Sequence, residues 1–100
     1  MERIICSAIH YKEAPTPIHT VTNVSQGLIL CGMRHSDIIG QCSSLTGKRS
    51  SEMGSYEQGF LTTYKRFVDR EEAFKIALEA DQILDLTKTS GEKLYSEDLY

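Results

Sequence analysis

The sequence predicts an α+β fold, with a mainly antiparallel β-sheet on which a short helix and a long helix of the C-terminal half pack. Two observations support this prediction. Short segments rich in β-branched residues are bounded by Pro and Gly, as strands commonly are. Two other segments carry apolar residues at helical spacing. A chain of 100 residues has room for one domain, residues 1–100.

The N-terminal part contains extended segments. Residues 3–11 (RIICSAIHY) are dominated by β-branched side chains and are predicted to form a strand. The stretch KEAPTP, residues 12–17, ends that strand with two prolines. Residues 18–24 (IHTVTNV) alternate in polarity, which fits either a second strand or an extended loop. Gly27 marks a turn, and residues 28–31 follow it as a short buried strand.

The middle of the chain predicts a helix followed by a polar loop. Ser36 is a good N-cap, and the apolar residues that follow have helical spacing, which predicts a short helix over 36–45. Gly40 weakens this helix by about 1 kcal/mol relative to Ala. Residues 46–55 (TGKRSSEMGS) are rich in Gly and Ser and predict a mobile loop.

The second half predicts a hairpin that leads into the most regular helix. Two strands are expected over 57–63 and 66–68, around a tight turn. Asp69 then serves as N-cap of a helix over 69–85, where apolar residues recur at i, i+4, i+7 and i+11. Gly91 interrupts the closing segment, whose Leu and Tyr side chains are expected to dock on the sheet.

Charge and composition narrow the function classes. The net charge of −3 divides into +2 for residues 1–68, with seven Lys/Arg against five Asp/Glu, and −5 for residues 69–100, with four against nine. The acidic C-terminal segment, residues 69–100, argues against DNA binding through a broad basic face. The mildly basic residues 1–68 can hold one small anion. Apolar runs are too short for a membrane helix, and the first residues lack a signal-peptide pattern.

The residues offer little for catalysis or for binding a metal or cofactor. Cys6 and Cys31 lie in predicted strands and Cys42 on the apolar side of a predicted helix, so all three are expected to be buried. The scattered thiols fit a reducing cytosol. The sequence has no CxxC, HxxxH, GxGxxG or P-loop motif. We therefore expect no metal and no cofactor, and no residue pattern here favours an enzyme.

Two stretches are suited to binding an anion, and the first is GMRHSD, residues 32–37. Arg34 and His35 immediately precede the predicted helix start. Main-chain N–H groups at that point, together with an arginine fork, suit a phosphate. The alternative is that Arg34 pairs with an acidic neighbour such as Asp37.

The second stretch is GFLTTYKRFVDREEAFKIA, residues 59–77. Phe60 follows a glycine on a predicted strand, and Arg70 lies in the first turn of the following helix. An aromatic ring can stack on a nucleotide base while a cation pairs with its phosphates. The alternatives are that Phe60 belongs to the core and that Arg70 is a surface residue or a partner of Glu57 or Glu71.

Four segments in this order, GMRHSD, QGF, KRFVDREEAFKIALEADQI and KLYSEDLY, resemble a family of small phage-encoded proteins. Its characterised members are the Thoeris anti-defence sponges of type 1, and the similarity runs over residues 28–100. The resemblance implies a ligand-binding domain in the cytoplasm of the infected bacterial host. It would capture, without cleaving it, a cyclic ADP-ribose isomer of the glycocyclic kind made by a TIR-domain defence enzyme.

The resemblance also implies an assembly and a set of contacts. The ligand would lie between two protomers of a homodimer, and a hexamer built as a trimer of dimers would also hold cyclic oligonucleotides. Phe60 would stack on the adenine, and Arg34 would hold a phosphate. Lys88 stands where an arginine is expected, and lysine lacks the bidentate fork. The implied ligand contacts are Arg34, His35, Phe60, Asp69, Arg70 and Lys88.

Two other functions stay open at this level. One is an enzyme that acts on a nucleotide and uses His35 or a carboxylate as base. The other is a small module that binds a host protein and has no small ligand. Neither alternative involves a membrane.

Overall fold

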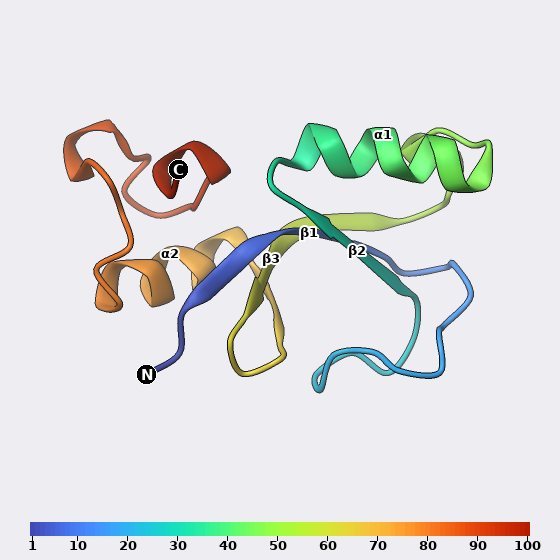
Figure 1. The fold of residues 1–100 in the computed structure, drawn as a ribbon, viewed down its shortest axis with the longest axis horizontal. Helices are drawn as coiled ribbons and strands as arrows, with labels where there is room; N and C mark the ends of the chain where they lie inside the picture. Colours follow the sequence, from blue (N-terminus) through green and yellow to red (C-terminus); the bar gives the residue numbers. More distant parts are fainter.

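The computed structural model describes residues 1–100 and confirms the predicted fold class (Figure 1). Four strands form one antiparallel sheet in the order β2-β1-β3-β4. Two α-helices pack on this sheet. The elements are β1 (Ile4–Tyr11), β2 (Leu28–Gly32), α1 (His35–Thr46), β3 (Tyr56–Thr62), β4 (Phe67–Asp69) and α2 (Arg70–Glu79).

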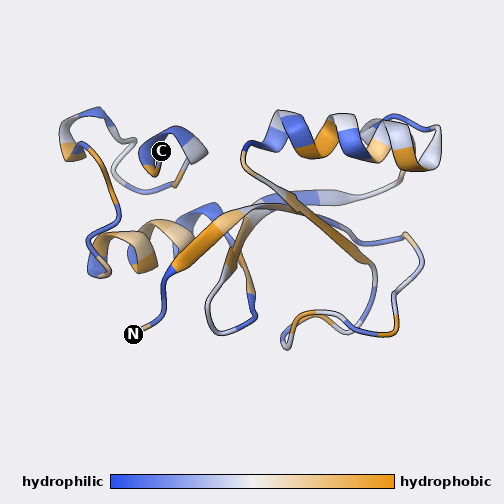
Figure 2. Cartoon of the chain, viewed as in Figure 1, coloured by the Kyte–Doolittle hydropathy of each residue, from blue (hydrophilic) through white to orange (hydrophobic).

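Both helices cover the same face of the sheet, which gives a fold of two layers. Ile9 and Gln58 are direct partners across β1 and β3, so Phe60, two residues beyond Gln58, lies on their face. Ile9 packs in one buried cluster with Ile38 of α1, and Phe60 in a second with Phe74 of α2. Figure 2 shows that β1 and β2 are the most continuously apolar elements, while the helices alternate between apolar and polar residues.

The segment between β1 and β2 forms a loop rather than the possible strand over 18–24. Within it, the Asn23 amide lies beside the outer edge of β4. Its Nδ2 donates to Phe67 O at 2.6 Å, and its Oδ1 accepts from Phe67 N at 2.8 Å. Thr22 N also donates to Lys65 O at 2.8 Å. One side chain thereby satisfies the edge groups that a further strand would have paired.

The N-cap of helix α1 lies two residues before the predicted one, Ser36. The N-cap is Arg34, whose backbone is extended at φ −124° and ψ 152°. The Asp37 carboxylate accepts a hydrogen bond from Arg34 N at 3.2 Å, which stabilises this start. Ser36 therefore lies inside the helix, and Arg34 lies at the helix N-terminus.

The loop that follows α1 is anchored at its centre. It contains a 3₁₀ turn over Ser50–Glu52. The buried Ser50 hydroxyl lies 2.8 Å from the Tyr11 hydroxyl of β1. The polar composition of this loop therefore did not reveal the buried contact at its centre.

Helix α2 begins as predicted and ends earlier. The Asp69 carboxylate accepts from Glu72 N at 2.8 Å, which confirms Asp69 as N-cap. The helix ends at Glu79, and Asp81 has a left-handed φ of 58°, a conformation that stops a helix. The prediction extended to residue 85 because apolar residues keep a helical spacing beyond Glu79. Residues after Glu79 also pack against the core, but they do so outside the helix.

The rest of the chain folds back over the starts of the two helices (Figure 1). Leu94 is fully buried in the cluster around Phe60, so part of the tail docks as expected. Two 3₁₀ turns, Leu86–Lys88 and Ser96–Asp98, interrupt the tail. No helix of the structure combines the length and the apolar character required to cross a membrane.

Candidate anion-binding site

A pocket of about 410 Å³ lies where the starts of both helices meet the tail. The strand register explains this convergence. Ser7 of β1 pairs with Gly32 at the end of β2 and also with Phe60 of β3, and Phe60 pairs with Val68 near the end of β4. β2 and β4 therefore end at nearly the same row of the sheet, and the helices that follow them, α1 and α2, begin close to each other. The lining residues are Arg34, His35, Ser36, Arg70, Tyr95, Ser96 and Glu97.

Arg70 is a half-buried cation whose partners are all uncharged. Its Nη1 donates to Leu94 O at 2.8 Å, and its Nη2 donates to Gln58 Oε1 at 2.6 Å and lies 3.5 Å from His35 Nδ1. The guanidinium carbon lies 4.5 Å from the centre of the Tyr95 ring. Burial lowers the pKa of Arg70, which is the signature of a cation that is only partly compensated.

Arg34 faces the same pocket from the start of α1. Its Nη1 donates to Ser96 Oγ at 3.0 Å, its Nη2 donates to the main-chain oxygen of Tyr100, and its guanidinium carbon lies 5.1 Å from the Tyr100 ring. The predicted alternative, an ion pair with Asp37, is not formed, because the Asp37 carboxylate accepts from the Arg34 main chain instead.

Neither arginine forms an ion pair with an Asp or Glu side chain. The salt bridges of the chain involve Arg66 and Lys88. Glu97 lines the pocket without pairing to either arginine, and the suggested partners of Arg70, Glu57 and Glu71, do not pair with it. Two guanidinium groups therefore share a small hollow in which neither forms an ion pair with the one carboxylate of the lining, that of Glu97.

His35 is a buried, neutral acceptor between the core and Arg70. Its Nε2 lies 2.9 Å from Gly59 O, and because a carbonyl only accepts, Nε2 carries the proton. Nδ1 is then left to accept from Arg70. Burial, and secondarily the charge of Arg70, lowers the pKa of His35. The imidazole therefore helps to orient the Arg70 guanidinium.

Phe60 is not placed as the resemblance implied. Its side chain is 0% exposed, and its ring packs edge-to-face beneath His35 with centroids 5.2 Å apart. The reason is the strand register, which puts Phe60 on the face that α2 covers. A ligand ring cannot stack on it in this structure. The ring that lines the pocket is Tyr95, which is 42% exposed.

The other two predicted contacts lie outside the pocket. Asp69 is engaged as the N-cap of α2 and lines neighbouring hollows. Lys88 has an 82% exposed side chain, lies 3.9 Å from Asp85 and does not line the pocket. The structure thus brings together Arg34, His35 and Arg70.

Sequence reasoning missed the residues that hold these three in place. They are Gln58, Tyr95, Ser96 and Tyr100, the last three within the KLYSEDLY segment. That segment carried part of the resemblance but no assigned role. Nothing local in it indicates a contact with Arg34, which lies 62 positions before Ser96.

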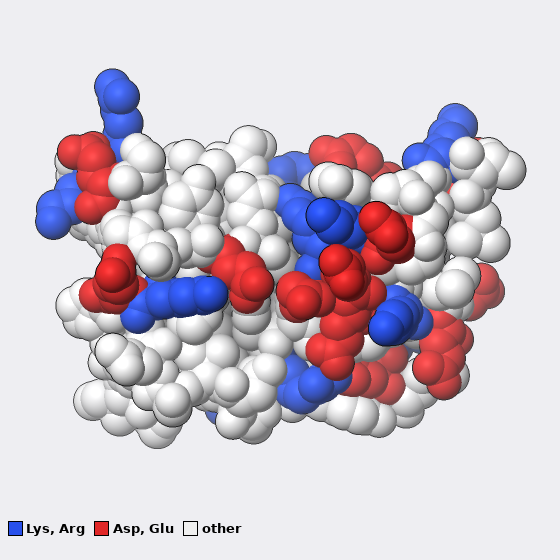
Figure 3. Space-filling view, turned by 180° about the vertical axis from the view of Figure 1, so that it is seen from behind, with Lys and Arg blue, Asp and Glu red and all other residues white.

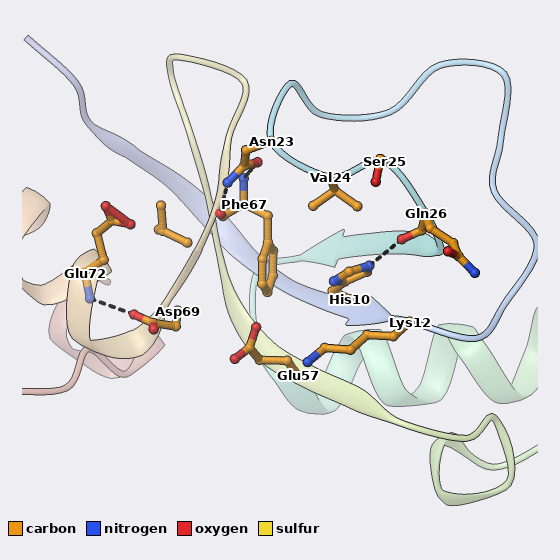
Figure 4. Close-up of a pocket in the computed structure, with 11 residues that line it drawn as sticks. His10, Lys12, Asn23, Val24, Ser25, Gln26, Glu57, Phe67, Asp69 and Glu72 are labelled. Carbon is orange, nitrogen blue, oxygen red and sulfur yellow. Dashed lines mark hydrogen bonds between the residues drawn. The ribbon is translucent and has the colours of Figure 1, made fainter.

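A larger groove, of about 580 Å³, lies on the other face of the sheet (Figure 4). His10 lies beside the Phe67 ring there, and its Nε2 is 2.8 Å from Gln26 O. The charged lining is one lysine, Lys12, and three carboxylates, of Glu57, Asp69 and Glu72. This balance of charge opposes an anion, so the smaller pocket is the better candidate site.

The side of the molecule drawn in Figure 3 carries no extended basic face. Acidic side chains gather in a column near the middle of that view, with single basic side chains beside them. This distribution agrees with the net charge of −3. A small anionic ligand in an enclosed pocket fits such a surface better than a polyanion does.

The thiols lie away from the pocket. Cys42 is buried as expected, whereas Cys6 is half-buried and Cys31 is exposed, because both lie on the sheet face away from the helices. Burial raises the pKa of Cys6 to about 11, and the neighbouring Cys31 adds to the rise. No three His, Cys, Asp or Glu side chains come together as a set able to hold a metal ion.

The fold and the pocket define a small two-layer α+β protein with a cationic cleft at the junction of two helix starts. A family model described as Phage T4 y16D protein matches residues 3–100, so the chain belongs to that family and is a phage-encoded protein. Comparison with curated proteins gives no match, and comparison with solved structures gives none either.

Proposed function

We propose that this phage protein binds and sequesters a phosphorylated, nucleotide-derived signal of the cyclic ADP-ribose class, without cleaving it, in the cytoplasm of the infected host. One observation carries the proposal. Arg34 and Arg70 share a pocket, and neither forms an ion pair with an Asp or Glu side chain. A half-buried cation without a counter-charge is costly unless an anion joins it.

The arrangement suits phosphate because its donors are held in advance. Leu94 O and Gln58 Oε1 fix the Arg70 guanidinium. Arginine has five N–H donors, so Arg70 keeps others for a ligand beside these two bonds. Hydrogen bonds between guanidinium and phosphate are roughly twice as strong as neutral ones. Fixed donors lose little entropy when the ligand binds.

The pocket in one chain supplies part of what sequestration requires. A signal near micromolar concentration must be held with roughly −10 to −12 kcal/mol. Tyr95 offers an exposed ring beside the Arg70 guanidinium, and so takes the stacking role first assigned to Phe60. A second copy of the chain, in a homodimer or a trimer of dimers, would enclose the remainder of the ligand.

Ligand depletion followed by heating tests this function. The protein is incubated with glycocyclic ADP-ribose isomers, separated from free ligand, heated, and the supernatant analysed by mass spectrometry. We expect depletion followed by release of the intact compound. A changed compound would indicate an enzyme, and absence of depletion would indicate a protein-interaction module.

Charge-matched variants locate the site. Arg34→Gln and Arg70→Gln are each expected to weaken binding at least tenfold in isothermal titration, because each removes a charge-assisted contact. Arg49→Gln removes the same charge from an exposed position outside the pocket and is expected to bind like the wild type. Equal weakening by all three would mean that the ligand responds to net charge and not to this pocket.

A further inference from the structure

We infer that residues 96–100, the strap, occupy the end of the Arg34 fork and are displaced when an anion enters the pocket. This inference rests on the proposed function, because the displacing group is the anion that the pocket binds. Both terminal nitrogens of Arg34 are engaged by the strap, Nη1 by Ser96 Oγ at 3.0 Å and Nη2 by the main-chain oxygen of Tyr100. A phosphate that takes the same fork must replace both contacts.

The strap has a fixed point on one side. Leu94 is fully buried, its N donates to Arg70 O at 2.9 Å, and its O accepts from Arg70 Nη1 at 2.8 Å. Beyond that residue the burial varies: Tyr95 is 42% exposed, whereas Ser96, which contacts Arg34, is 3% exposed. A change that starts at Arg34 can therefore move the strap while Leu94 stays in the core.

The strap is also a unit that keeps its own hydrogen bonds when it moves. Asp98 N donates to Tyr95 O at 2.9 Å, and Leu99 N and Tyr100 N both donate to Ser96 O, at 3.1 and 3.3 Å. The two bonds to Ser96 O join strap residues to one another, and the bond to Tyr95 O joins the strap to the residue before it. Displacement therefore costs neither of the two bonds to Ser96 O directly.

The strap has further contacts with the body of the protein, one of which is the Tyr100 ring, 5.1 Å from the Arg34 guanidinium carbon. Tyr100 Oη donates to Met33 O at 2.7 Å, and Leu84 N donates to Asp98 O at 2.9 Å. Leu99 packs partly against the core. A phosphate that gains charge-assisted bonds to Arg34 competes well with these attachments, since each ordinary hydrogen bond contributes only about 0.5–1.5 kcal/mol.

Hydrogen exchange with pyrophosphate as the probe tests the displacement. Deuterium uptake is followed by mass spectrometry in a peptide that covers residues 95–100, with pyrophosphate and with sodium chloride at matched ionic strength. We expect pyrophosphate to increase uptake in the strap, and a peptide from β1 to stay unchanged. Binding with unchanged or reduced uptake overturns this inference and leaves the proposed function standing.

A conservative substitution tests the same competition by affinity. Tyr100→Phe removes the bond to Met33 and leaves the ring over Arg34, so it loosens the strap outside the fork. We expect pyrophosphate to bind roughly two- to tenfold more tightly, the equivalent of one hydrogen bond. Tyr64→Phe, at a 56% exposed ring whose hydroxyl has no hydrogen bond, is the matched control.

The outcomes separate the two claims. Unchanged or weaker binding by Tyr100→Phe means that the strap does not compete, which overturns the inference. Failure of the wild type to bind pyrophosphate at all, in the same titration, overturns the proposed anion site itself and the strap mechanism with it.

Discussion

Replacing Phe60 with Ala separates a core role from a ligand-binding role. The Phe60 ring is 0% exposed and sits in a cluster with Ile4, Val68, Ala73, Phe74, Ala77 and Leu94. Truncating a buried Phe to Ala costs about 3–5 kcal/mol through lost burial and the cavity left behind. The ring also supports His35, at 5.2 Å between centroids, so the same change loosens the residue that orients Arg70.

The loss is large enough to measure by thermal or urea unfolding. A domain of this size typically has about 5–15 kcal/mol of stability, and each kcal/mol moves Tm by roughly 4–8 °C. We therefore expect Phe60→Ala to lower Tm by at least about 12 °C. Tyr95→Ala, at a half-exposed ring, is expected to change stability by less than about 1 kcal/mol and to weaken ligand binding instead.

The opposite pattern would refute this reasoning. If Phe60→Ala kept the wild-type Tm and abolished ligand binding, its ring would face the ligand, as the resemblance first implied. A Tyr95→Ala variant with full affinity would further show that the tail does not line the site.

Three further predictions concern stability. Because burial and Arg70 lower the pKa of His35, the contribution of His35 to stability is fully present above about pH 6.5 and falls as the pH drops toward its folded pKa. Urea unfolding between pH 7.5 and 5.5 should show this loss of stability, and His35→Gln should make the loss smaller. Gly59→Ala should cost about 1–3 kcal/mol, since its Cβ would collide with Val68 O of the neighbouring strand. Gly40→Ala has nothing within 4 Å of the new Cβ and should raise the stability of α1 by up to about 1 kcal/mol, and scanning calorimetry distinguishes the two alanine variants.

The proposed anion site holds a partly buried cation, Arg70, without an ion pair. Arg70 is desolvated by burial, yet its contacts are to Leu94 O, Gln58 and His35, none of which carries a negative charge. Pairing it with a carboxylate would neutralise the cation and block the pocket. The uncharged partners hold its geometry and leave its charge for a ligand.

Local features of the chain were predictable because their causes are local. β-branched runs bounded by Pro and Gly marked the strands. Asp69 was identified as N-cap because its carboxylate reaches only as far as Glu72, three residues on. The class of fold follows from the order of such elements, and Arg34, His35 and Arg70 were found because they stand at helix starts.

What the sequence alone determined is the set of helices and strands, together with the cations at the N-termini of the two helices. Tertiary structure decided which of them share a site, because strand register put Phe60 under α2, and because Ser96 and Tyr100 reach Arg34 across 62 and 66 positions. Such contacts depend on how separate elements pack in space. Hydrophobic spacing and capping patterns act over a few residues and therefore carry no information about them.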